Sequence, residues 1–157
     1  GLASVQLAKR RGAKVIAIAG ADKHADVMAA GADQVYARNV NLEALLGPQS
    51  VDLVVDNVAG EDFSKRVKLL KVGGRLATSG AIAGPIVNVD LRDLYLKDIR
   101  LLGSTAWDEP VFPNLVSYIE AGQLTPKVSA TYALADIVQA QQEFAKKEHV
   151  GKIVLIP

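Results

Sequence analysis

Glycines and small side chains follow most of the predicted strands, and these residue types let a ligand approach the protein backbone closely. In open parallel α/β sheets, ligands bind at the carboxyl ends of the strands. A single glycine at the end of a strand more often only terminates the strand or helix and binds no ligand. Together, however, the small residues at four of five strand ends favour a dinucleotide site. The five strand ends are Ala19-Gly20, Ala37-Arg38, Asp56–Gly60, Ser79–Ala83 and Gly103-Ser104.

Other kinds of site are not expected. The sequence has no cysteine, which excludes thiol catalysis, disulfide frameworks and cysteine-built zinc sites in this segment. His24 and His149 lie far apart, and neither has a carboxylate or second histidine at ligand spacing, so we expect this segment to bind no zinc. Ser79 lacks the Gly-X-Ser-X-Gly frame of a nucleophile elbow. No residue can be assigned a catalytic role.

Helical and strand patterns alternate along the chain. Helices are predicted at Leu2–Arg11, Ala21–Ala30, Leu42–Leu46, Phe63–Leu70, Val89–Leu96, Val111–Ala121 and Leu134–Lys146. Strands are predicted at Lys14–Ala19, Gln34–Ala37, Val51–Asp56, Arg75–Ser79, Ile99–Leu102 and Lys152–Ile156. Gly73-Gly74 is expected to end the fourth helix. The continuous apolar runs at Lys14–Ala19 and Val51–Asp56 indicate strands buried on both faces, and hence a parallel sheet covered by helices on both sides.

Composition limits the classes of partner. The 157 residues are 50% hydrophobic and 22% charged, as expected for a globular domain. With 18 basic and 17 acidic residues, the chain has no surplus of positive charge for nucleic acid or an anionic membrane. It also lacks a spanning apolar run and a signal pattern. We therefore expect a soluble protein, and the lack of cysteine fits a reducing compartment such as the cytoplasm. Because the chain starts at Gly1 within a helical pattern, we also expect it to be a fragment.

Six segments in order carry a resemblance to a known family. They are Gly1 with VQLAKRRGAKVIAIAG, then GADQV at 31–35, VDLVVDNVAG at 51–60, KVGGRLATSG at 71–80, IRLLGS at 99–104 and HVGKIVLIP at 149–157. Together they resemble the cofactor-binding half of the medium-chain dehydrogenase/reductase superfamily, which contains zinc alcohol dehydrogenases and zinc-free quinone oxidoreductases.

The resemblance implies an α/β fold, a Rossmann-type doubly wound parallel sheet truncated at its first strand. Gly1 falls where the last glycine of the family's Gly-X-Gly-X-X-Gly turn belongs. Residues 1–107 would form the NAD(P)-binding domain. Residues 108–157 would be a short C-terminal return to the substrate domain.

The choice between NAD and NADP depends on the end of the second family strand. NAD-binding Rossmann domains place a carboxylate there to bind the ribose, but this chain has Ala19-Gly20, and Asp22 is offset. Lys23 and Arg38 are cations that could bind a 2′-phosphate, although both could also be ordinary surface charges. We therefore predict NADP(H) in preference to NAD(H).

The remaining cofactor contacts follow from the resemblance. Residues after two further strands would line the path from adenosine to nicotinamide, Gly103 and Ser104 would approach the nicotinamide amide, and Lys152 would face the pyrophosphate or be a strand-flanking charge. The predicted cofactor-binding residues are Gly1, Gly20, Lys23, Arg38, Asn57, Val58, Ser79, Gly80, Ala81, Gly103, Ser104 and Lys152.

The function implied is that of an oxidoreductase that transfers hydride between NADP(H) and a quinone, enone or carbonyl/alcohol substrate. A zinc-dependent alcohol dehydrogenase of the same superfamily is one alternative, and a non-enzymatic NAD(P)-binding regulatory domain is the other. The catalytic residues would lie upstream of Gly1, so we expect the segment alone to bind cofactor poorly and to be inactive.

The predicted strand at Ile99–Leu102 suggests how the protein assembles. It would be the last strand of the sheet, and Arg100 is its only charge, so it offers little protection against pairing with another strand. In the family this strand commonly pairs with its copy in a second subunit. We therefore expect a homodimer through residues 99–105, unless the loop Trp107–Pro113 covers the edge.

Overall fold

The computed structural model describes residues 1–157, which form two compact units. One unit contains Gly1–Asn39 together with Glu109–Pro157, and the other contains Val40–Asp108. The division into domains at residues 107 and 108 stays a prediction. None of the helices has the length and apolar character that a membrane-spanning segment requires.

The first unit contains two pairs of parallel strands. Its elements are α1 (Leu2–Arg10), β1 (Ile16–Ile18), η1 (Ala21–Lys23), α2 (His24–Ala29), β2 (Gln34–Tyr36), α6 (Val111–Glu120), β6 (Val128–Ala133), η2 (Leu134–Asp136), α7 (Ile137–Lys146) and β7 (Lys152–Ile156). Strand β1 pairs with β2, and β6 pairs with β7. Val5, Val27 and Ala32 are buried together and join α1 and α2 to the segment before β2.

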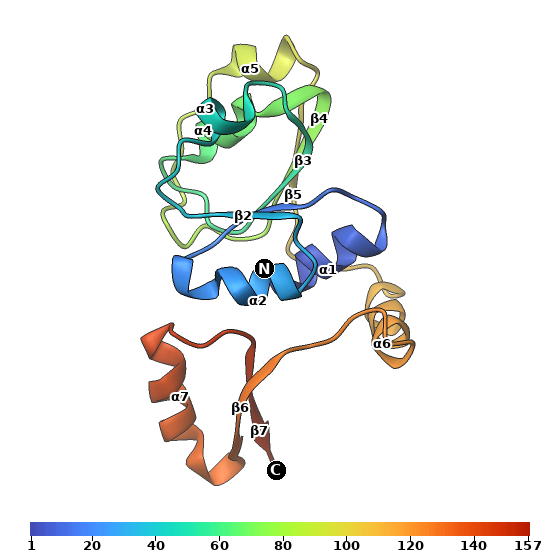
Figure 1. Cartoon of the computed structure of the whole chain (residues 1–157), viewed down its shortest axis with the longest axis vertical. Helices are drawn as coiled ribbons and strands as arrows, with labels where there is room; N and C mark the ends of the chain where they lie inside the picture. The colour runs from blue at the N-terminus through green and yellow to red at the C-terminus, as the bar shows by residue number, and fades with distance from the viewer. The chain divides into compact units, whose positions relative to one another are not determined.

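The second unit contains a three-stranded parallel sheet in the order β3-β4-β5, which can be followed in Figure 1. Its elements are α3 (Leu42–Leu46), β3 (Val51–Asp56), α4 (Phe63–Lys68), β4 (Leu70–Thr78), α5 (Leu91–Tyr95) and β5 (Arg100–Gly103). Asp56 is paired with Thr78, and Thr78 with Gly103, so the carboxyl ends of the three strands lie side by side. The buried core of this unit consists of Ala59, Phe63, Val67, Leu70 and Leu76.

The predicted α/β class with parallel strand pairing is confirmed, because every paired strand runs parallel to its neighbour. The paired strands form three separate sheets rather than one. Strand β6 was not predicted, since its sequence VSATYA contains few large apolar residues. It forms because it pairs with the apolar strand β7.

The prediction that Val51–Asp56 is buried on both faces is wrong for this structure. Val51 and Val54 pack against the core, whereas Leu53 and Val55 are 47% and 56% exposed. Side chains alternate between the two faces of a strand, and only one face of β3 is packed within its unit. Ile18 of β1, at 43% exposure, departs from the prediction in the same way.

The prediction that Gly73-Gly74 ends a helix is also wrong. Helix α4 ends at Lys68, and the two glycines lie inside β4, where the pairing with β3 shifts in register. Gly73 has a φ of +74°, and its N–H donates to the Lys97 carbonyl oxygen at 2.7 Å. A Cβ on Gly74 would lie 2.8 Å from the Lys71 carbonyl oxygen. The glycines therefore permit an irregular strand rather than stop a helix.

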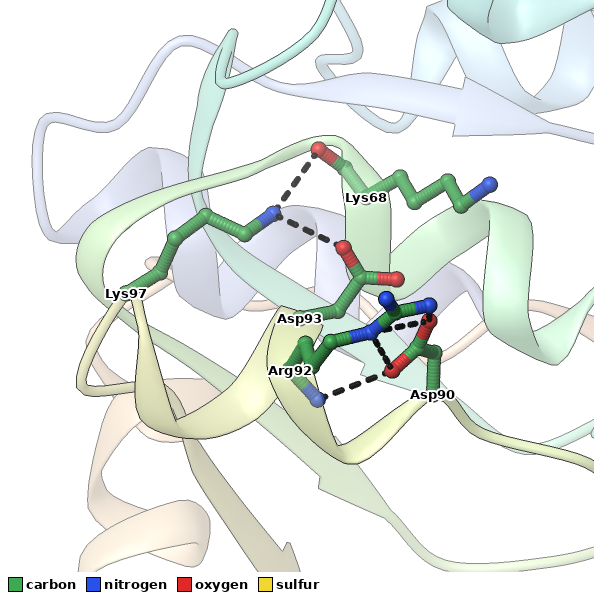
Figure 2. Close-up of polar contacts among 5 residues, drawn as sticks. All are labelled: Lys68, Asp90, Arg92, Asp93 and Lys97. Atoms are coloured by element: carbon green, nitrogen blue, oxygen red, sulfur yellow. Dashed lines mark hydrogen bonds and ion pairs between the residues drawn. The ribbon is translucent and has the colours of Figure 1, made fainter.

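Helix α5 is short, and polar side chains fix both of its ends (Figure 2). Asp90 accepts a hydrogen bond from the Arg92 N–H at 2.9 Å and forms an ion pair with the Arg92 guanidinium. These hydrogen bonds from Arg92 lower the pKa of Asp90 to about 2. At the other end, the Lys97 ammonium lies 4.0 Å from Asp93 and donates to the Lys68 carbonyl oxygen at 3.5 Å. Lys97 thus links the carboxyl end of α5 to the last residue of α4.

Candidate functional site

A pocket of about 470 Å³ opens at the carboxyl edge of the β3-β4-β5 sheet. It contains five of the predicted cofactor-binding residues, namely Ser79, Gly80, Ala81, Gly103 and Ser104. The other residues that line it are Ala59, Phe63, Thr78, Pro85, Val87 and Thr105. Asn57 and Val58 are exposed on the adjoining loop and do not line the pocket. The lining is mostly small or apolar, which suits a flat organic ligand.

The backbone near the pocket continues the hydrogen-bond pattern of the sheet. The Ser79 N–H donates to the Asp56 carbonyl oxygen at 3.0 Å, and the Ser104 N–H donates to the Thr78 carbonyl oxygen at 2.9 Å. These bonds hold the first residues of two loops in line with the strand ends. The pocket edge is therefore an extension of the sheet.

The two glycines of the pocket have different surroundings. A Cβ on Gly103 would meet no protein atom within 4 Å, so the space beside it is open to a ligand. A Cβ on Gly80 would lie 3.1 Å from the Asn57 carbonyl oxygen, so Gly80 lets the loops after β3 and β4 approach each other. The small residues thus leave the space that a bound nucleotide needs, and this part of the chain fits a nicotinamide cofactor.

Asp56 is a functional candidate that the sequence analysis missed. It is only 4% exposed, and its carboxylate accepts hydrogen bonds from the N–H groups of Val58 and Ala59 at 2.8 and 3.0 Å. It also forms an ion pair with the Arg66 guanidinium at 2.7 Å. Burial raises the pKa of Asp56, but the two N–H donors and Arg66 outweigh burial, and the pKa is lowered from its usual value. The sequence does contain a signal for this role, because Asp56 is a charged residue at the end of an otherwise largely apolar strand.

In the other unit, Gly1 and Lys152 lie near each other at the start of α1. Gly1 is the N-cap residue of α1, and the positive charge of Lys152 lies close enough to act on it. The first turn of a helix has unpaired N–H groups that attract anions, and a neighbouring lysine strengthens that attraction. The proximity of Lys152 to Gly1 favours a contact between Lys152 and the pyrophosphate, which stays a prediction.

The two predicted phosphate-binding cations differ in their surroundings. The Lys23 ammonium donates to the carbonyl oxygens of Lys147 at 2.8 Å and His149 at 3.5 Å. Arg38 follows β2, is exposed and forms no ion pair with a carboxylate of the chain. Gly20 precedes η1, and the Asp22 carboxylate lies where its Cβ would point. Arg38 is therefore the cation whose donors remain available to a ligand.

A hollow of about 610 Å³ lies at the opposite, amino end of β5 and is lined by Leu94, Tyr95, Asp98, Ile99 and Arg100. It is larger than the first pocket, but it contains none of the predicted cofactor-binding residues. No group of three or more histidine, cysteine, aspartate or glutamate side chains could hold a metal ion.

Known proteins share this fold over the whole chain. A protein of Sinorhizobium meliloti with a provisional assignment as an alcohol dehydrogenase is 41% identical, with a TM-score of 0.90, and the match covers 100% of this chain and 45% of that one. A mycobacterial protein complexed with NADPH is 28% identical, with a TM-score of 0.78, and the match covers 100% and 53%. The quinone oxidoreductase of Rattus norvegicus is 26% identical over 99% of this chain and 51% of its own length.

The chain spans about half the length of the curated relatives it matches. The fold is that of the Rossmann-like cofactor-binding domain of these enzymes. The sequence profile of the zinc-binding dehydrogenases matches residues 1–121. With this match over most of its length, and with the parallel sheet described above, the chain belongs to the zinc-binding dehydrogenase family within the medium-chain dehydrogenase/reductase superfamily.

Proposed function

We propose that the protein containing this chain is an NADP(H)-dependent oxidoreductase, and that this chain supplies its cofactor-binding part. The pocket at the carboxyl edge of β3-β4-β5 carries the proposal, because small residues from two loops, with open space beside Gly103, meet there. Parallel α/β sheets bind nucleotides at this edge.

In this proposal Ser79, Gly80, Ala81, Gly103 and Ser104 would hold the nicotinamide cofactor, which supplies the chemistry by carrying a hydride. The chain's own contribution is to orient the cofactor and to exclude water with apolar side chains such as Phe63 and Val87. The separate proposal that Arg38 binds a 2′-phosphate is based on its exposed guanidinium and on Ala19-Gly20 in place of a carboxylate.

The substrate class is proposed as a quinone, an enone or a carbonyl/alcohol pair. A quinone accepts a hydride from the cofactor and a proton from solvent, which gives a hydroquinone and the oxidised cofactor. The similarity of the chain to the quinone oxidoreductase of Rattus norvegicus supports a quinone as the substrate. The similarity to a provisionally assigned alcohol dehydrogenase supports the alternative.

The test uses the purified full-length gene product, with NADPH or NADH and a panel that contains a benzoquinone, an enone and a simple alcohol. We expect faster oxidation of NADPH than of NADH with the quinone or enone, followed at 340 nm. Binding of NADPH without turnover of any substrate would support a regulatory domain instead. Alcohol oxidation that is lost on chelation would support the zinc enzyme.

We also propose that the protein is a homodimer in which β5 pairs with its copy. Strand β5 forms hydrogen bonds with β4, and its other edge has no partner strand. Leu101 and Leu102 are 41% and 45% exposed, and Arg100 is the only charged residue of the strand. An apolar strand with a free edge is a template for pairing, and a twofold contact of this kind is self-complementary.

Replacing Leu101 by proline is expected to convert the dimer to monomers, because proline removes a backbone N–H donor from the strand. Leu102→Lys would add a charge to the same edge without disturbing the backbone, and we expect it to weaken the dimer too. The mass is measured by light scattering at tens of micromolar. A wild-type protein that is already monomeric there would contradict the model.

A further inference from the structure

The turn that follows β3 contains a residue in an unusual conformation. Ala59 has a φ of +55°, in the left-handed region that residues other than glycine rarely adopt. It is 6% exposed and forms part of the pocket wall. Such a residue stays in place only where its surroundings hold it.

The surroundings that hold Ala59 are Asp56 and Arg66. The Ala59 N–H donates to the Asp56 carboxylate at 3.0 Å, and its carbonyl oxygen accepts a hydrogen bond from the Arg66 guanidinium at 3.1 Å. The same guanidinium nitrogen, Nη1, also pairs with the other oxygen of Asp56 at 2.7 Å. Both polar backbone groups of Ala59 are therefore tied to one partly buried ion pair.

The position of Ala59 also affects the neighbouring loop. The Ala83 N–H donates to the Val58 carbonyl oxygen at 2.9 Å, and the Gly60 N–H donates to the Gly84 carbonyl oxygen at 3.2 Å. A Cβ on Gly60 would lie 2.9 Å from the Ala83 Cβ, so the two loops are already in close contact. A shift of the turn after β3 would consequently move the loop that carries Ser79, Gly80 and Ala81.

We propose that Asp56 and Arg66 are positioning residues, which do not touch the ligand but hold Ala59 in its left-handed conformation and so fix the pocket wall for the nicotinamide cofactor. This inference rests on the proposed function. The inference extends the proposed function to an ion pair whose two residues do not line the pocket themselves.

The test replaces Asp56 by asparagine in the full-length gene product. Asparagine keeps the size of the side chain but loses the charge that pairs with Arg66, and its amide group would face the guanidinium donors. We expect NADPH to bind about tenfold more weakly in a fluorescence titration. Without ligand, we expect the amide hydrogens of Val58 and Ala59 to exchange faster. Asp52→Asn is the matched control, because Asp52 lies on the same strand but pairs with Lys71 at the surface.

A rescue variant separates positioning from general stability. Glycine adopts the left-handed conformation without strain, so adding Ala59→Gly to Asp56→Asn is expected to recover part of the NADPH affinity. If Asp56→Asn does not fold, Arg66→Gln removes the same ion pair and leaves the hydrogen bonds that the Val58 and Ala59 N–H groups donate to Asp56. Faster exchange with unchanged NADPH affinity in the variant would overturn the positioning role and leave the proposed function standing. A wild-type protein that binds neither NADPH nor NADH would instead overturn the proposed function, whatever the exchange rates.

Discussion

Replacing Leu76 by alanine is expected to lower the free energy of unfolding by about 2–5 kcal/mol. Leu76 lies in the second half of β4, is fully buried and packs in the cluster of Phe63, Val67 and Leu70. Truncation removes apolar contacts and leaves a cavity that the packed neighbours fill only in part. The change is measured by urea unfolding of the full-length gene product, with wild type alongside.

The matched control is Leu45→Ala on α3. Leu45 belongs to the same unit but is 50% exposed and lies outside the core cluster, so its loss should cost less than about 1 kcal/mol. Equal effects of the two substitutions would contradict the assignment of the core. Because Phe63 and Ala59 belong both to the core and to the pocket wall, Leu76→Ala should also weaken cofactor binding.

Replacing Arg38 by alanine is expected to weaken NADPH binding by about 1.5–3 kcal/mol, the usual strength of a hydrogen bond to a charged group. NADH lacks the 2′-phosphate, so its affinity should change little. Both affinities are measured by calorimetry on the full-length gene product. The change in the ratio of the two affinities is the quantity that tests the NADP(H) preference.

Arg11→Ala provides the control for a general loss of positive charge. Arg11 is exposed at the end of α1, and its guanidinium donates only to the Leu7 carbonyl oxygen at 3.3 Å. It should affect neither cofactor. Equal losses of NADPH and NADH affinity in Arg38→Ala would refute the phosphate contact.

Several elements could be predicted closely because their signals are local. Helix α3 begins and ends at the predicted residues, and the Asn41 side chain caps it by accepting a hydrogen bond from the Ala44 N–H at 3.1 Å. Strand β3 also matches its prediction, since a short apolar run with β-branched residues is typical of a parallel strand. The grouping of Ser79–Ala81 with Gly103 and Ser104 followed from the rule that parallel strands end at one edge.

Other features depend on contacts between distant residues. Strand β6 is stabilised by pairing with β7, which begins about twenty residues later, so its own sequence gave little indication of it. The pairing of Asp56 with Arg66, ten residues further on, required the turn and α4 to be in place. The exposed faces of β1 and β3 could not be predicted either. An apolar run shows that both faces of a strand can be buried, but it does not show whether another element packs on each face.

The contacts of Lys23 matter to anyone who would re-engineer the cofactor preference of this protein. Its ammonium donates to the carbonyl oxygens of Lys147 and His149, at the carboxyl end of α7, where Lys147 itself has a φ of +61°. A cation there pairs with carbonyl groups of the turn that follows α7, close to the negative end of the helix. Mutagenesis of Lys23 would therefore loosen the turn after α7 while it altered the charge near Gly20. In a library designed to exchange one cofactor for the other, Arg38 can be varied freely, whereas Lys23 should be kept or changed together with its turn.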